Sequence, residues 1–87
     1  MSETVRCWLV YREYTDKGLV ELVYASTDGE RVYEREIAAN ALAGNPATAA
    51  RDCDPGELRP VSEPETVSRY AAEATRMAER HDPDAEV

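Results

Sequence analysis

Apolar and polar positions alternate in the first half of the chain, and this pattern predicts a β-meander. Three runs are rich in β-branched and aromatic residues: VRCWLVYREY (5–14), LVELVYA (19–25) and RVYEREI (31–37). Turn signals, TDKG and DG, separate the runs. We therefore expect a three-stranded antiparallel sheet over residues 5–37, and the rest of the chain is arranged around it.

The second turn sets the pairing of the last two strands. Asp28-Gly29 is typical of a two-residue type I′ hairpin, in which both central residues have positive φ. Thr27 then faces Glu30. Counting outward from there gives the pairs Tyr24 with Tyr33, Leu22 with Arg35, Val20 with Ile37, Val23 with Glu34 and Glu21 with Glu36. Because side chains alternate along a strand, the first three pairs share one face of the sheet.

The first turn decides which residues of the first strand join that face. A three-residue loop, with Gly18 at positive φ, places Thr15 opposite Leu19. It also sets Glu13 against Glu21, which is a like-charge pair. A four-residue loop would avoid that pair and move Trp8 to the other face. We favour the three-residue loop, which predicts an aromatic face made of Trp8, Val10, Arg12, Tyr14, Leu22, Tyr24, Tyr33 and Arg35.

The middle of the chain, residues 38–61, predicts short helical turns and irregular structure. The run AANALAG has helical composition and is ended by Gly44-Asn45-Pro46. Asn45 can cap a second short helix over residues 46–52.

A longer amphipathic helix is predicted over residues 62–81. Ser62 and Glu65 have the spacing of a capping box, and Asp82 before Pro83 is a stop signal. One apolar stripe recurs at three- and four-residue steps: Val67, Tyr70, Ala71, Ala74, Met77, Ala78 and His81. The acidic tail, residues 82–87, is expected to be disordered. The predicted architecture is thus one α+β domain over residues 1–87, with the C-terminal helix packed on the meander.

Charge and composition describe an acidic chain with almost no lysine. The 87 residues include 18 acids and 10 basic residues, for a formal charge of −8. Lys17 is the one lysine. This composition, together with the segment PETVSRYAAEATRMAERHDPD, resembles small uncharacterised proteins of salt-loving archaea, and the resemblance implies a habitat but no activity. At molar salt the Debye length is about 3 Å, so the net charge says little about partners.

Candidate catalytic chemistry is sparse, and we expect neither an enzyme nor a bound cofactor. Cys7 and Cys53 are far apart in sequence and are expected to be ordinary reduced thiols. Neither cysteine nor His81 has a partner at the short spacing that zinc sites use. The sequence contains no glycine-rich phosphate loop. No apolar run approaches the roughly 20 residues of a membrane-spanning helix, and no signal-peptide pattern opens the chain. We therefore expect a cytoplasmic protein that does not bind a membrane.

The predicted aromatic face suggests a function in binding. A single helix covers one side of a sheet, so the other side would expose a large apolar patch. A second copy of the chain is the simplest cover, which predicts a homodimer or another protein partner. The alternative cover is the chain itself, if the short middle helices fold back over this side and leave a monomer. The alternative is a nucleic-acid-binding domain, in which Arg6, Arg12, Arg31 and Arg35 contact phosphates while Trp8 and Tyr24 stack on bases. The acids beside these arginines make nucleic acid the less favoured partner.

Overall fold

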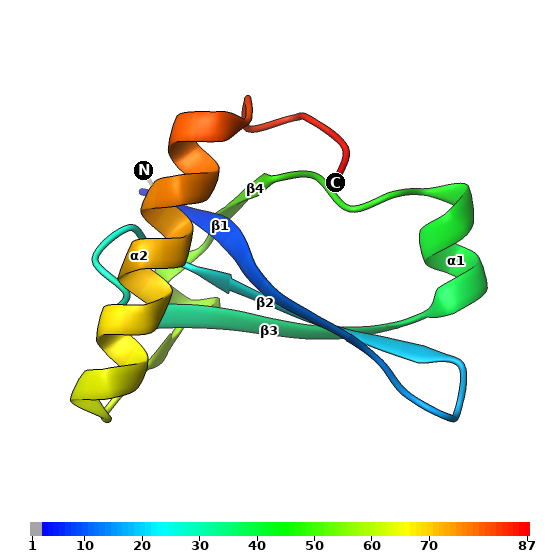
Figure 1. Ribbon diagram of the computed structural model, residues 1–87, viewed down its shortest axis with the longest axis horizontal. Coiled ribbons are helices and arrows are strands. Elements are labelled where there is room, and N and C mark those ends of the chain that lie inside the picture. The colour runs from blue at the N-terminus through cyan, green and yellow to red at the C-terminus, as the bar shows by residue number, and fades with distance from the viewer. Residues whose placement is uncertain (1–2) are drawn as a thin grey trace.

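A computed structural model describes residues 3–87 and shows an α+β fold built on an antiparallel sheet (Figure 1). The strand order is β4-β1-β2-β3-β5. The elements are β1 (Val5–Tyr14), β2 (Leu19–Ala25), β3 (Arg31–Ala38), α1 (Ala39–Gly44), β4 (Ala50–Cys53), a 3₁₀ turn (Pro55–Glu57), β5 (Arg59–Pro60) and α2 (Pro64–Arg80). The predicted α+β class, meander and C-terminal helix are confirmed, but the sheet has five strands and not three.

The β1–β2 hairpin has the predicted three-residue loop and an unpredicted bulge. The Thr15 N–H donates to the Leu19 carbonyl at 2.8 Å, and Gly18 has a φ of 74°. Pairing follows the prediction up to Tyr11, including Glu13 opposite Glu21. A bulge between Leu9 and Tyr11 then shifts the register by one residue. This shift brings Trp8 to the opposite face from the one we predicted.

The β2–β3 hairpin has the predicted register but a different turn. Tyr24 pairs with Tyr33 and Leu22 with Arg35. Gly29 has a φ of 72°, whereas no described residue other than glycine has a positive φ, so the type I′ assignment was wrong. Asp28 instead stabilises the turn with its carboxylate, which accepts from the Ser26 hydroxyl at 2.6 Å and the Glu30 N–H at 2.9 Å. The Ser26 hydrogen bond is also the main reason why the pKa of Asp28 is lowered.

Two short strands in the middle of the chain complete the sheet. β4 pairs with the start of β1, with Cys7 opposite Arg51, and β5 pairs with β3. The short helix predicted over residues 46–52 is therefore wrong, whereas the helical run before it is present as α1. β4 lies on the edge of β1 that faces away from β2, where the free backbone groups of β1 favour a strand partner over a local helix.

α2 packs across one face of the sheet, which we call the helix face (Figure 1). This face contains Trp8, Val23, Ala25 and Val32, buried beside Ala74 and Tyr70 of the helix. The approach is close at Gly29, where an added Cβ would lie 2.1 Å from the Val67 carbonyl oxygen.

The ends of α2 differ from the prediction. The residue that precedes the helix is Glu63, with no side-chain hydrogen bond to the first turn, so the capping box of Ser62 and Glu65 is wrong. The predicted apolar stripe contacts the sheet only as far as Met77, because Ala78 and His81 are exposed.

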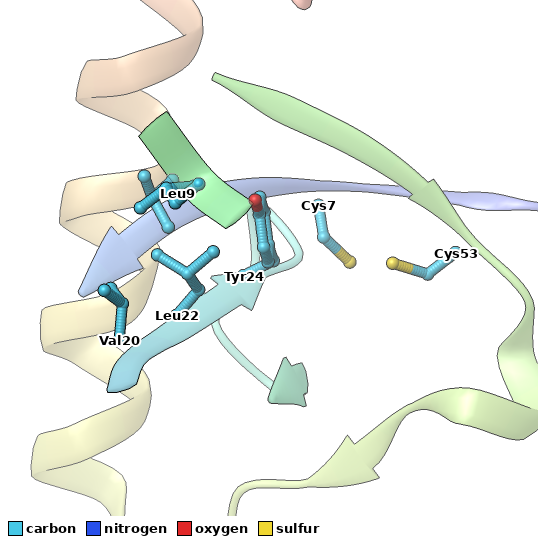
Figure 2. Packing of buried hydrophobic residues seen from close by; sticks show 7 residues of the cluster. Cys7, Leu9, Val20, Leu22, Tyr24 and Cys53 are labelled. Atoms are coloured by element: carbon cyan, nitrogen blue, oxygen red, sulfur yellow. The ribbon is translucent and has the colours of Figure 1, made fainter. Parts of the chain in front are cut away.

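The opposite side of the sheet, which we call the loop face, is covered by the middle of the chain. Its buried core consists of Cys7, Leu9, Val20, Leu22, Tyr24 and Cys53 (Figure 2), together with Leu42 of α1. Residues 83–87, which we expected to be disordered, lie against the segment that precedes β4. The Ala49 N–H donates to the Ala85 carbonyl, and the Val87 N–H donates to the Ala47 carbonyl. The tail is therefore part of the cover.

Candidate functional site

A pocket of about 360 Å³ lies between the loop face and the segment that runs from α1 to β4. The sheet supplies its floor, α1 and the following loop supply one wall, and β4 supplies the other. Irregular chain covers this part of the sheet, and α1 is only 6 residues long. The lining residues are Leu22, Tyr24, Arg35, Ile37, Ala41, Leu42, Asn45, Pro46, Ala47, Thr48 and Arg51.

The charges in this pocket are all positive. Arg35 and Arg51 line it, and no aspartate or glutamate does. Neither arginine forms a salt bridge with any residue in the described range 3–87, although the chain has 18 acids. Elsewhere on the surface, arginines do pair with acids, as Arg6 does with Asp52 at 3.0 Å. The pocket is therefore a local cationic site on an acidic protein.

Arg51 is held in place by the sheet, but not all of its hydrogen-bond donors have a partner. β4 positions it opposite Cys7, and its guanidinium lies 4.8 Å from the centre of the Tyr33 ring. Its Nε atom is buried and has no hydrogen-bond partner among the described residues. A buried donor without a partner is costly, so a ligand that accepts from this guanidinium gains a favourable interaction.

Tyr24 places a phenol beside the two guanidiniums. The residue is 3% exposed, and its ring packs at a tilt against Tyr33 with centroids 6.2 Å apart. Burial raises the pKa of Tyr24, while the nearby Arg51 and Arg35 oppose that rise. The phenol is thus protonated at neutral pH and is close to both cations. Its hydroxyl can donate a hydrogen bond to an acceptor in the pocket.

The arrangement supports binding better than catalysis. Two guanidiniums and a neutral phenol can hold an oxyanion, but none of them is a base or a nucleophile at neutral pH. The thiols beneath the pocket are free and buried, and burial is the main reason why the pKa of Cys7 is raised to about 12. A protonated thiol is a poor nucleophile.

Metal-binding clusters and membrane-spanning helices are both absent from the described residues. Within residues 3–87, no group of three or more His, Cys, Asp or Glu side chains is arranged to hold a metal ion. None of the helices in the same range has the length and apolar character to cross a membrane.

The structure distributes the eight residues of the predicted aromatic face among several environments. Leu22, Tyr24 and Arg35 line the pocket, and Tyr33 lies beside it under Arg51. Tyr14 is 64% exposed near the hairpin tip, and Arg12 donates to the Val87 carbonyl at 3.0 Å. Trp8 is 6% exposed on the helix face, and Val10, at the bulge, packs with the helix-face clusters. The predicted face is therefore not one continuous surface.

Sequence reasoning missed the pocket residues that come from the middle of the chain: Arg51, Asn45 and Thr48. Arg51 lies in a segment that we expected to be helical. The burial around it does not alternate as in a half-buried strand, because Ala50 and Cys53, three residues apart, are both buried, and the strand is only four residues long. A run this short is a weak signal, because a helix segment and a strand look alike over such a length.

The exposed surface alters the argument for a partner. The large hydrophobic residues left exposed are Tyr11 and Tyr14, which lie on opposite faces of the sheet. The large apolar patch that led us to expect a dimer is thus absent from the described residues, and self-association stays a prediction without that support. Trp8 and Tyr24 are buried, so neither presents a ring for stacking on a base.

The fold and the pocket together describe a small α+β domain with a cationic site on the side of its sheet that lies opposite α2. The chain belongs to DUF7967, a family of unknown function whose model matches residues 1–87. No curated protein and no solved structure matches it. Membership of this family gives no information about the habitat of the organism, so adaptation to high salt stays a prediction.

Proposed function

We propose that this protein is a small ligand-binding domain, without catalytic activity, that binds an anion in the pocket of the loop face. The observation that carries the proposal is the pair Arg35 and Arg51, which line the pocket without any acidic neighbour there. The sequence also suggested a binding module, but one that recognises a second protein. The ligand proposed here is instead a small molecule, because the site is a pocket and not a flat apolar face.

The energetics favour occupation by an anion. Hydrogen bonds to charged groups contribute roughly 1.5–3 kcal/mol each, and a guanidinium can donate two to one oxyanion. Arg51 is fixed by the sheet and by Tyr33, so little additional side-chain freedom is lost on binding. The surrounding acids repel anions at long range, but salt screens that repulsion more strongly than it screens contacts inside a pocket.

An NMR titration tests the proposal. Acetate and sulfate are titrated at constant ionic strength while the Nε–H signals of the arginines are followed. We expect saturable shifts at Arg35 and Arg51, and loss of these responses in the variants Arg35→Met and Arg51→Met. The matched control is Arg80→Met, because Arg80 is exposed in the last turn of α2. Absence of saturation, or equal responses in all three variants, would overturn the proposal.

A further inference from the structure

We infer that the ligand of this pocket is a small monocarboxylic acid with an apolar body, and not a phosphate or an inorganic anion. The inference rests on the proposed function, since it names the class of anion that the same site takes. Three features carry it: the apolar part of the lining, the kind of donors that the pocket offers, and the net charge of the chain.

The apolar part of the pocket indicates a ligand with a hydrocarbon portion. Leu22 and Leu42 are already buried, but four other apolar lining residues keep exposed surface: Ile37, Ala41, Pro46 and Ala47. An inorganic ion would leave these side chains in contact with water, whereas an aliphatic chain or a ring would cover them. A volume of about 360 Å³ is near the lower end of the usual range for small-molecule sites.

The donors in the pocket suit a carboxylate better than a phosphate. Phosphate sites commonly use clustered backbone N–H groups at glycine-rich turns or helix starts. No glycine lines this pocket, and the N–H of Asn45 is already bonded to the Ala41 carbonyl at 3.0 Å. The charged donors that remain are guanidiniums, whose planar fork matches a carboxylate and a phosphate alike. The preference for a carboxylate therefore rests on the lack of clustered backbone donors.

The net charge favours a ligand with a single negative charge. The chain carries −8 at neutral pH, so at low ionic strength each added charge on a ligand increases the unfavourable long-range term, which molar salt would screen. A monocarboxylate uses the local attraction of Arg35 and Arg51 with the smallest such cost. We place its carboxylate between the two guanidiniums and the Tyr24 phenol, and its apolar body along Ile37 and Leu42.

The test is a series of ligands that separates charge from apolar content. Acetate, butyrate, hexanoate and benzoate are titrated by NMR at constant ionic strength, with phosphate as the multiply charged anion and hexanol as the neutral analogue. We expect Kd to fall by about fourfold for each added methylene group. Phosphate and hexanol are expected to bind at least tenfold more weakly than hexanoate. Arg35→Met and Arg51→Met weaken hexanoate binding at least tenfold, and Arg80→Met leaves it unchanged.

The outcomes separate this inference from the proposed function. If acetate and phosphate bind as tightly as hexanoate, the pocket binds anions but the ligand class is wrong. If hexanol binds as tightly as hexanoate, the pocket does not select for charge, and both the ligand class and the anion site are wrong. If none of the probes binds saturably, the proposed function itself fails. Arg35 is exposed, so its variant is expected to fold even if a change at Arg51 disturbs β4.

Discussion

Each face of the sheet lines a hollow, and these two hollows differ in the charged residues that surround them. The hollow beside α2, of about 410 Å³, includes both acids and arginines, and two of these, Arg59 and Glu34, form a salt bridge with each other. The pocket on the loop face, of about 360 Å³, contains two arginines and no acid. Charges on the helix side are thus partly neutralised by the chain itself, whereas Arg35 and Arg51 on the loop face form no salt bridge within residues 3–87.

The two faces also differ in how closely they are packed. On the helix face, small residues allow the backbone of α2 to approach the turn between β2 and β3 at Gly29. On the loop face, a helix of 6 residues and irregular chain form the cover, which leaves a pocket above Leu22 and Tyr24. A regular helix with small side chains can match a sheet closely, whereas a loop cover leaves space. The comparison predicts that a ligand binds on the loop face, whereas stability depends on both faces, because the fully buried Leu22 and Val20 lie on the loop face.

The largest expected effect is on the helix face. Trp8→Ala removes a side chain that is 6% exposed and packs with Ala49, Ala50 and Ala74. We expect a loss of about 3–5 kcal/mol in the free energy of unfolding, measured with urea. Tyr14→Ala, on the same strand, is the control: Tyr14 is 64% exposed, and the change should cost less than about 1 kcal/mol. Similar losses in both variants would contradict the placement of Trp8.

Gly29→Ala tests the close approach of α2. The alanine would be strained at a φ of 72°, and its Cβ would meet the Val67 carbonyl, so we expect a loss of about 2–5 kcal/mol. Gly18→Ala is a matched control, because Gly18 has a φ of 74° but nothing within 4 Å of its added Cβ. That change should cost only the backbone strain, about 1–2 kcal/mol. If the two unfolding curves coincide, α2 does not lie against the second turn.

The buried thiol of Cys7, on the loop face, predicts that the protein loses stability at alkaline pH. In the unfolded chain Cys7 ionises near its ordinary pKa of about 8.5, but in the folded protein its pKa is about 12. The folded state therefore holds its proton more tightly, and stability falls as pH rises above the ordinary range towards the folded value. The slope is at most about 1.4 kcal/mol per pH unit for one thiol. Cys7→Ala should flatten the decline in unfolding free energy between pH 9 and 10, and parallel curves for the two proteins would contradict this.

The smallest expected effect on stability is at the pocket arginines. Arg35→Met removes an exposed group with no salt bridge in the described residues, so the free energy of unfolding should change by less than about 0.5 kcal/mol. Arg51→Met also loses the contact with Tyr33, which is worth roughly 0.5–1 kcal/mol. Urea unfolding without ligand measures both values. A loss from Arg35→Met as large as that from Trp8→Ala would mean that Arg35 is structural.

Local patterns were enough to predict the meander, but pairings between distant segments were not. The alternation of residues and Asp28-Gly29 predicted the register of β2 and β3, because a short turn fixes which residues face each other. The bulge near Val10 has no comparable local signal, yet it exchanges the faces of Trp8 and Leu9. β4 depends on free backbone groups at the distant start of β1. Arg51, which β4 carries, was missed for that reason.

The candidate site was predictable only in the part that the meander supplies. Leu22, Tyr24 and Arg35 were grouped correctly on one face, because they follow from the β2–β3 register. Their exposure was not predictable, since it depends on whether α1 and the following loop fold back over them. The structure shows that they do, and this converts an expected flat interface into a pocket.

One methyl-resolved NMR titration with hexanoate tests most directly the claim that the loop face, and not the helix face, binds a ligand. We predict saturable shifts of the methyl signals of Leu22, Ile37 and Leu42, which line the pocket. The methyl signals of Val23 and Val32, on the helix face, should stay in place. Shifts of similar size on both faces, or no shift at the pocket methyls, would contradict the account.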